Sequence, residues 1–497
     1  MRLMVEVPAT AQFRAIHEAP AAERAKLTER LGRLLALPFV QFAIADRPFR
    51  SVEFQGLKRT RVRGLASRLV FSLIFANPRD MIDVAKALNM TAAAQDVTFG
   101  VDLPIGALEH WCPGRERPPS FTTQSRALSL IRAGALREQA PPLLGEGVNV
   151  VMVDLGLNQA ALRRQAPQVR FGGGWRVMQD GPGSRDAIPF QAPARGHGSM
   201  VATGLLAVSP AVTLFDLPLL PDRLGSVIPW TSWAQEVLNQ VRDDILGSIG
   251  VPGLAAEYPG TWVFCHAWGV YDRRSEQPYT GVIPLYTGDP SHPLNQLIKT
   301  LAQDGFDQVF AAGNGGQFCP HPLCGPGDTG PGQSIFGAAC LGEVLTVGAV
   351  RNDGMWIGYS SQGPGQPGFG PVDKPDLCTP SQFFGDDDAS LLCSGTSAAC
   401  GIAAGAVVAL RGDDSPLAGW SSTNLFAQLR NTARQPPGIA PGHHARTGHG
   451  ILDLGAALDG LSARTGPPIP RPPTESLPPP PPPIRPAVAE PARRAMR

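Results

Sequence analysis

Residues 394–410 read SGTSAACGIAAGAVVAL, and this stretch decides the expected fold. Ser397 opens a long run of small and aliphatic residues, which predicts a buried helix. The free backbone N–H groups and the positive dipole at the start of such a helix favour a nearby anion, and a tetrahedral reaction intermediate is such an anion. A serine at a helix start is most often an N-cap residue. Taken alone, Ser397 therefore indicates either a cap or a nucleophile.

Three further segments place a polar side chain at the end of an apolar run or between glycines. Residues 148–156 (VNVVMVDLG) form an expected strand that runs into Asp154, and catalytic groups of open α/β sheets sit at the carboxyl ends of strands. His197 lies between two glycines ahead of an apolar run. Asn314 follows another apolar run on a glycine-rich turn, where its amide can donate to a developing oxyanion. Each residue also has an ordinary structural explanation, as a turn aspartate, a satisfied histidine or a turn asparagine.

Together the four residues are far more specific, because they occur in the order Asp154, His197, Asn314, Ser397. The order Asp, His, Ser is that of the subtilisin triad, whereas an α/β-hydrolase needs Gly-x-Ser-x-Gly and the order Ser, Asp, His. The residue two positions after the serine is alanine, not glycine. The chain therefore resembles the subtilase (S8) family of serine peptidases over about residues 123–463.

The resemblance implies a role for each matched residue. Ser397 is the expected nucleophile, His197 the general base and Asp154 the residue that orients the imidazole, while Asn314 and the backbone N–H of Ser397 stabilise the oxyanion. The fold implied is a subtilisin-like three-layer α/β fold, in which a parallel sheet carries helices on both faces. The matching segments also imply a set of substrate-binding residues: Ala267, Trp268, Gly269, Ala311, Ala312 and Gly313.

Two positions depart from the family pattern. Leu155 stands where the family usually has serine or threonine, and Gly401 stands where it usually has proline, four residues after the nucleophile. Proline would stiffen the helix start, whereas glycine is expected to loosen it. Neither departure removes a reacting group, so they bear on the expected rate and not on the reaction class.

The chain divides into four expected regions. Residues 1–108 are predicted to form a small α+β domain of ferredoxin-like order, β-α-β-β-α-β, corresponding to the inhibitory, fold-assisting prodomain of the family and making the chain a zymogen. Residues 109–122 are rich in proline and charge and are expected to be an exposed, cleavable linker. Residues 123–463 alternate apolar strands with helices, which is typical of a parallel α/β sheet. Residues 464–497 form a proline-rich tail, expected to be disordered.

Particular elements are expected within these regions. In the first 108 residues, strands are expected at 3–7, 39–45, 69–76 and 96–105, with one helix between the first two strands and another that starts at Asn77-Pro78. In the larger region, strands are expected at 148–153, 262–266, 308–312 and 344–350.

Composition narrows the possible partners. The formal net charge of +1 gives nothing that would steer the chain to nucleic acid or to an anionic membrane. The longest apolar run, 398–410, is shorter than the ~20 residues that a membrane span needs. No secretory signal pattern is visible, so a cytoplasmic location is expected. The eight cysteines form no disulfide-scaffold pattern and are expected to be mainly buried thiols.

No cofactor is expected to be required. Residues 386–388 (DDD) offer carboxylates for calcium, which many subtilases bind, but an acidic surface loop is the favoured interpretation. The spacing of Cys319, His321 and Cys324 fits no standard structural zinc set.

Three functions fit the sequence. The first is a serine endopeptidase that acts on protein or peptide substrates, is held latent by its own N-terminal domain and is processed near 109–122. The second is the same chemistry dedicated to one protein partner. The third is a catalytically weak subtilase fold that serves as a binding scaffold. The complete set of Asp, His, Asn and Ser argues against the third, because loss of function would be expected to remove one of them.

Overall fold

The computed structural model describes residues 1–45, 49–56, 67–108, 110, 122–179, 188–220, 229–248, 251–370, 373–386, 388 and 391–462. The expected linker lies outside these ranges except for residues 110 and 122, and the expected proline-rich tail lies wholly outside them.

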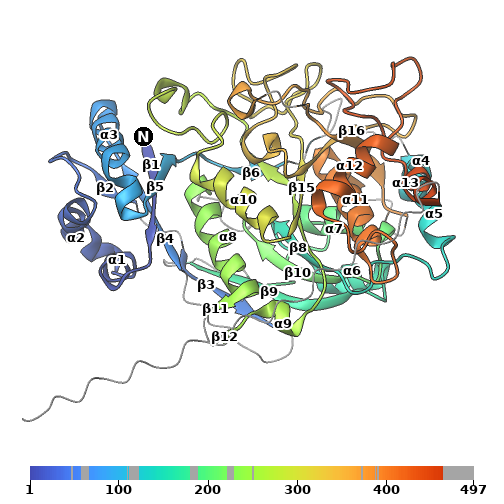
Figure 1. Cartoon of the computed structure of the whole chain (residues 1–497), viewed down its shortest axis with the longest axis horizontal. Helices are drawn as coiled ribbons and strands as arrows, with labels where there is room; N and C mark the ends of the chain where they lie inside the picture. Colours follow the sequence, from blue (N-terminus) through green and yellow to red (C-terminus); the bar gives the residue numbers. More distant parts are fainter. Residues whose placement is uncertain are drawn as a thin grey trace, which may run out of the picture.

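An eight-stranded sheet forms the centre of the molecule, in the order β17-β16-β15-β13-β8-β10-β9-β3 (Figure 1). Neighbouring strands are parallel except for β3, which runs antiparallel to β9. The strands are β3 Phe49–Gln55, β8 Asn149–Asp154, β9 Arg170–Gln179, β10 Thr213–Pro218, β13 Trp262–His266, β15 Asp307–Ala311, β16 Leu345–Val350 and β17 Leu377–Pro380. The four strands that the sequence predicted in this region occur as β8, β13, β15 and β16.

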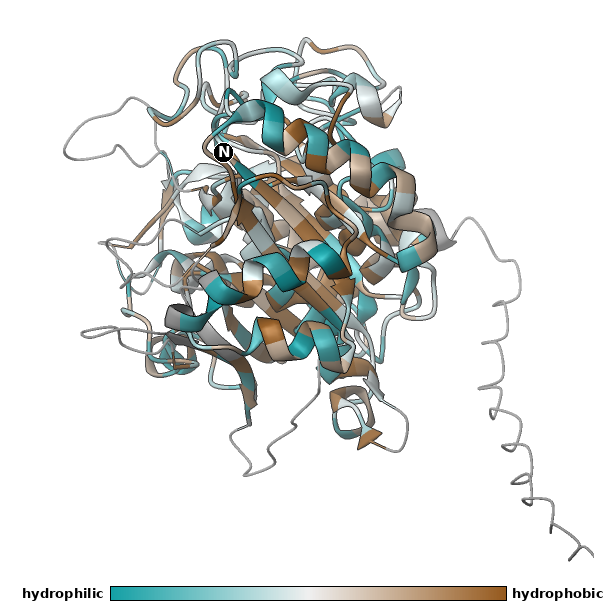
Figure 2. Ribbon diagram, turned by 90° about the vertical axis from the view of Figure 1, so that its left-hand side faces the viewer, coloured by the Kyte–Doolittle hydropathy of each residue, from teal (hydrophilic) through white to brown (hydrophobic). Residues whose placement is uncertain are grey.

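Alternate side chains of each central strand enter two separate cores. In β8, Val150 and Met152 belong to one core, and Val151 and Val153 belong to the other. The first core lies beneath α7 (His197–Val208) and α11 (Gly395–Arg411), the second beneath α8 (Thr231–Leu246) and α10 (Pro293–Gln303). In Figure 2 the strands of the sheet are mostly brown, and the helices that lie over them carry both teal and brown segments. The central part of the chain therefore has the predicted three-layer, subtilisin-like architecture.

Helices α7 and α11 pack closely and run in parallel. A Cβ atom on Gly401 would lie 2.3 Å from the carbonyl oxygen of Val201, and one on Gly405 would lie 2.6 Å from that of Leu205. The same sequence offset separates both pairs, so the two helices keep a constant register over this turn. Gly401 thus serves the close approach of two helices, which is a different role from the loosening that the sequence suggested.

Residues 1–108 contribute a second sheet, in the order β2-β4-β1-β5 with antiparallel neighbours. Asn77 caps α3 by accepting a hydrogen bond from the backbone N–H of Arg79 at 2.9 Å, as the Asn-Pro dipeptide predicted. The strand expected at 39–45 is reduced to two residues, and two helices rather than one precede it. The elements are β1 Arg2–Pro8, α1 Ala11–His17, α2 Ala21–Leu34, β2 Ala43–Ile44, β4 Arg68–Ile74, α3 Pro78–Gln95 and β5 Thr98–Val101.

The remaining elements lie around the two sheets. They are β7 Thr122–Thr123, α4 Gln124–Leu130, α5 Gly134–Arg137, α6 Gln159–Gln165, β11 Gly247–Ser248, β12 Val251–Pro252, α9 Leu254–Glu257, β18 Phe383–Phe384, β19 Leu392–Cys393, α12 Ser422–Thr432 and α13 Leu454–Ser462. Among the helices in the described ranges, none has both the length and the apolar character needed to cross a bilayer.

Candidate active site

Asp154 and His197 meet where β8 ends and α7 begins. Oδ1 of Asp154 lies 2.6 Å from Nδ1 of His197, and each side chain is only 1% exposed. The backbone N–H of Leu155 donates to the same carboxylate oxygen at 2.6 Å, which fixes its orientation. Gly198 permits this approach, because a Cβ atom there would lie 2.4 Å from the carbonyl oxygen of Gly156.

Ser397 lies in the first turn of α11, where Ser394 and not Ser397 holds the N-cap position. The interpretation of Ser397 as a helix cap is therefore wrong. Its Oγ donates to the carbonyl oxygen of Ala267 at 3.3 Å, and the residue is fully buried.

The packing of α7 on α11 brings His197 and Ser397 to the same level. Val201 faces Gly401 and Leu205 faces Gly405 across the helix contact. The helices are parallel and keep this register. One turn nearer to the starts of both helices, His197 therefore lies opposite Ser397. The helix pair therefore collects the imidazole and the hydroxyl at one end of the sheet, where β8 also ends.

The amide of Asn314 is held in one orientation. Its Oδ1 accepts hydrogen bonds from both the backbone N–H and the hydroxyl of Thr396, each at 2.9 Å. That hydroxyl also accepts from the N–H of Gly313 at 3.2 Å. With its oxygen occupied in this way, the side chain directs Nδ2 outward, where it donates to the carbonyl oxygen of Leu108 at 2.5 Å.

The last described residues before the expected linker lie along the site as an extended strand. β6 (Gly106–Ala107) pairs antiparallel with β14 (Trp268–Gly269). One residue further, the N–H of Leu108 donates to the carbonyl oxygen of Ala267 at 3.0 Å. The carbonyl group of Leu108 is therefore the group that Asn314 binds, and the same carbonyl of Ala267 accepts from both Leu108 and Ser397.

The side chain of Leu108 is buried on the catalytic side of the sheet. It is 3% exposed and belongs to the same core as Ala267 and Ala311. Gly269 leaves room for it, since a Cβ atom there would lie 3.3 Å from a Leu108 methyl group. Trp268, expected to line a pocket, packs into the opposite core and donates from Nε1 to His266 at 3.1 Å, so it meets the extended segment through its backbone.

A second buried carboxylate lies next to the candidate triad. Asp216 on β10 is fully buried and accepts hydrogen bonds from the N–H groups of Leu157 at 3.2 Å and Phe190 at 2.6 Å. Burial, with a smaller contribution from the nearby charge of Asp154, raises the pKa of Asp216 to about 7. This group holds the two loops that flank the end of β8.

Sequence reasoning missed three residues of the site, namely Leu108, Thr396 and Asp216. Leu108 had one available signal, its place immediately before the proline-rich and charged segment. Thr396 and Asp216 lie within an apparent helix start and an apolar strand, so only their contacts distinguish them.

The residues considered for metal binding have other partners. Asp386 accepts from the N–H of Ser125 at 3.0 Å, and Asp388 pairs with Arg195 at 2.9 Å, while position 387 lies outside the described residues. In the part of the chain that the structure describes, no three His, Cys, Asp or Glu side chains are grouped so as to hold a metal ion. Cys324 is a free thiol, and burial raises its pKa to about 12.

A model of the subtilase family matches residues 178–450, which is more than half of the chain. The chain belongs to the subtilase family. His197, Asn314 and Ser397 lie inside the matched segment, and Asp154 lies outside it, N-terminal to its first residue, 178. At the family level this subtilase is a serine protease.

Solved structures also resemble this subtilase. MycP1 from the ESX-1 type VII secretion system aligns with a TM-score of 0.43 at 18% identity, over 75% of this chain and 93% of that chain. MycP1 from Mycobacterium smegmatis aligns with a TM-score of 0.42 at 18% identity, over 72% and 90%. No curated protein matches the chain.

Proposed function

We propose that this subtilase is an active serine endopeptidase with Asp154, His197 and Ser397 as its triad and Asn314 as its oxyanion donor. The observation that carries the proposal is the 2.5 Å hydrogen bond from Asn314 Nδ2 to the carbonyl oxygen of Leu108, a group presented on an antiparallel strand beside Ser397. An oxyanion donor must point to the place where the carbonyl oxygen of a substrate becomes negative.

Each residue has a role in the proposed reaction. Ser397 Oγ attacks the carbonyl carbon, and His197 accepts the hydroxyl proton while Asp154 stabilises the imidazolium that forms. His197 then gives the proton to the leaving amine as the C–N bond breaks. Water, activated by the same imidazole, hydrolyses the ester and releases a carboxylate. The reaction needs no cofactor.

The first substrate in this proposal is the chain itself, cut between Leu108 and Glu109. Leu108 donates its N–H to Ala267 and offers its carbonyl to Asn314, as the residue before a scissile bond would. Residues 1–108 would then act as an inhibitor, because their end occupies the site until it leaves. Substrates in trans would be proteins or peptides with an apolar residue such as leucine before the cut.

The test compares the wild-type chain with Ser397→Ala. We expect the wild type to yield a fragment whose N-terminal sequence begins at Glu109, and a fluorophosphonate probe to label Ser397. The Ser397→Ala chain should stay intact and unlabelled. Cleavage of this variant at the same bond would assign the processing to another protease, and a folded, processed wild type that stays unlabelled would favour the binding-scaffold alternative. Profiling the processed enzyme on a peptide library would distinguish a general endopeptidase from one dedicated to a single partner.

A further inference from the structure

Residues 1–108 meet the rest of the subtilase in two unlike ways. The strap, residues 104–108, follows the active-site cleft. The body, residues 1–103, packs against β9 and α8. Whether processing frees the N-terminal part depends on which of these two contacts holds it.

The strap is held by backbone hydrogen bonds along one line and by two buried side chains, Ile105 and Leu108. Pro104 forms an isolated bridge with Trp230, and the N–H of Ile105 donates to the carbonyl oxygen of Pro229 at 2.9 Å. The pairing of β6 with β14 and the two hydrogen bonds of Leu108 complete the line. A strand held in this way can detach once its end is cut, as a product does.

Contacts of the body include a strand, β3, added to the edge of the catalytic sheet. β3 pairs with β9 over its whole length, in a register that sets Phe54 beside Trp175. Phe54 is 1% exposed, and its ring lies 5.5 Å from that of Trp175 and 6.4 Å from that of Phe215. Nε1 of Trp175 donates to Asp244 at 2.9 Å, which fixes the indole under the strand. Loss of β3 would expose this aromatic cluster and the open edge of β9.

The catalytic part is shaped to accept β3. Gly173 on β9 has a φ of +128°, a conformation that only glycine adopts readily. A Cβ atom there would lie 2.6 Å from the carbonyl oxygen of Gln55 and 2.8 Å from the ring of Phe54. The sequence of β9 therefore accommodates a strand that comes from the N-terminal part.

Buried carboxylates of the body are bound by α8. Glu6 accepts from Gln235 Nε2 at 2.8 Å and from Asn239 Nδ2. Asp102 accepts from the N–H and the hydroxyl of Ser232 at 2.9 and 2.8 Å, at the start of the helix. Separation would leave these polar groups without their partners, which is costly in a site that cannot rearrange.

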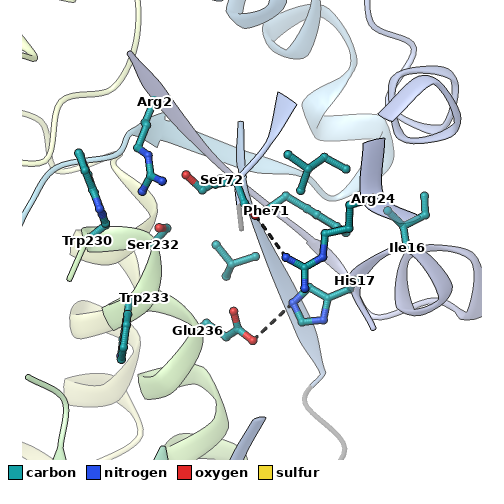
Figure 3. A pocket seen from close by; sticks show the side chains of 13 residues that line it. Arg2, Ile16, His17, Arg24, Phe71, Ser72, Trp230, Ser232, Trp233 and Glu236 are labelled. Atoms are coloured by element: carbon teal, nitrogen blue, oxygen red, sulfur yellow. Dashed lines mark hydrogen bonds and ion pairs between the residues drawn. The ribbon is translucent and has the colours of Figure 1, made fainter. Parts of the chain in front are cut away.

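Figure 3 shows the same interface around a small cavity of about 50 Å³. His17 from the body and Glu236 from α8 face one another across it, 3.4 Å apart. The guanidinium of Arg2 lies 4.2 Å from the centre of the Trp230 ring. The interface is thus polar as well as apolar, and it continues from β3 to the point where the strap begins.

We propose that, after a cut behind Leu108, the body stays in place as a permanent non-covalent subunit and only the strap leaves the cleft. The boundary between them is Leu103, whose N–H donates to the hydroxyl of Thr231 at 3.0 Å and whose carbonyl accepts from the N–H of Thr231 at 2.7 Å. Activation is then release of a strap, not loss of a domain. The cut itself rests on the proposed function, but retention of the body does not.

The experiment separates the two ideas by making the cut with a foreign protease. A recognition site flanked by glycine and serine is inserted into segment 111–121 of the full Ser397→Ala chain, which is then cut to completion. We expect both pieces to co-elute on size-exclusion chromatography at about 1 µM, where a nanomolar interface stays intact. We also expect residues 170–177 of β9 to keep their hydrogen-exchange protection. Separate elution of a folded C-terminal piece that begins at the inserted site, or loss of that protection, would overturn the proposal.

Matched variants identify which contact holds the two pieces together. Phe54→Ala should raise the dissociation constant of the cut complex about 100-fold or more. Phe42→Ala removes the same kind of ring within the body, where it contacts Phe75, and should change the constant less than tenfold. A Leu108→Gly strap should leave co-elution unchanged. If Leu108→Gly alone separates the pieces, the strap is the anchor and the proposal is wrong.

A last arm uses the processed wild type. The fluorophosphonate probe should label Ser397 while the body still co-elutes with it. Labelling only in the fraction that has lost the body would contradict the strap mechanism. No labelling in any fraction would count against the proposed peptidase and leave the co-elution result as it stands.

Discussion

The two faces of the eight-stranded sheet are packed by different kinds of residue. On the face of α7 and α11, glycines let backbone approach backbone, as at Gly401 against Val201. On the face of α8, large aromatic side chains such as Trp175 and Phe215 fill the space and surround Phe54 of β3. On the first face, backbone contacts therefore set the distance between the helices. On the second face, aromatic side chains bury apolar surface area.

This difference matches what each face has to do. The proposed catalysis requires that Asp154, His197 and Ser397 hold a geometry accurate to a fraction of an ångström, and close packing of backbone on backbone leaves little freedom to deviate from it. Attachment of an N-terminal segment requires buried apolar area, which a separate strand can supply as well as a covalently continuous one.

The largest effect is expected at the nucleophile. Ser397→Ala should lower kcat by about four to six orders of magnitude, because the serine and histidine act as one unit. Ser394→Ala is the matched control, since Ser394 lies one turn earlier at the N-cap position. It should lower kcat less than about tenfold and change stability little, because the buried Ser394 hydroxyl makes no capping hydrogen bond that alanine would remove. Hydrolysis of a peptide with leucine before the cut measures both, and comparable losses of kcat would contradict the assignment.

The next largest effect is expected at the oxyanion donor. Asn314→Ala should lower kcat by about 10²–10³ with little change in KM, a magnitude known from subtilisin itself. Thr396→Val removes the hydroxyl that holds Asn314 Oδ1 and should lower kcat by about tenfold, whereas Thr396→Ser keeps that hydroxyl and should restore most of the rate. A KM effect equal to the kcat effect would mean that Asn314 binds the ground state.

The sequence predicts some features of the fold and of the candidate site, and not others. The order of Asp154, His197, Asn314 and Ser397 and the apolar strands β8, β13, β15 and β16 were readable, because each signal lies within a few neighbouring residues. The substrate-binding positions and the roles of the triad stay predictions that the experiments above address.

Other features depend on contacts between distant segments. β3 has a short alternation at Val52, Glu53 and Phe54, which is typical of a strand, but nothing in it names β9 as the partner. The sequence predicts that Gly401 loosens the helix start, whereas its contact with Val201 shows that it permits close helix packing. The place of Leu108 in the candidate site is known only from its hydrogen bonds with Ala267 and Asn314. Long-range pairing is not encoded in the local periodicity of either partner.

Two glycine-to-alanine substitutions test the glycine-packed face directly. Gly401→Ala places a methyl group 2.3 Å from the carbonyl oxygen of Val201, so the helices must separate at a cost of about 1–3 kcal/mol. Gly204→Ala, on the facing helix, meets its nearest atom, on Ile402, at 3.4 Å and should gain about 0.5–1 kcal/mol from helix propensity. Urea unfolding of both variants measures the sign. Equal effects would show that the helix contact is not the constraint.

Taken per pH unit, the last expected effect is a small one, a pH dependence of stability that originates on the catalytic face. The pKa of Asp216 is raised to about 7, above its ordinary value of 3.8, so the folded state keeps a proton that the unfolded state releases. Stability should therefore fall as the pH rises from about 4 to about 7, by about 1 kcal/mol per pH unit. Glu276, with a pKa raised to about 7 by burial, contributes in the same direction.

Variants of the two carboxyl groups separate their contributions. Asp216→Asn should make the fall shallower, and Glu276→Gln should do the same independently, as measured by urea unfolding at several pH values. Asp154→Asn distinguishes the sites, because the charge of Asp154 raises the pKa of Asp216 alone. It should move the Asp216 part of the window to lower pH and leave the Glu276 part in place. An Asp216 part that does not move would mean that the two carboxylates on β8 and β10 do not interact.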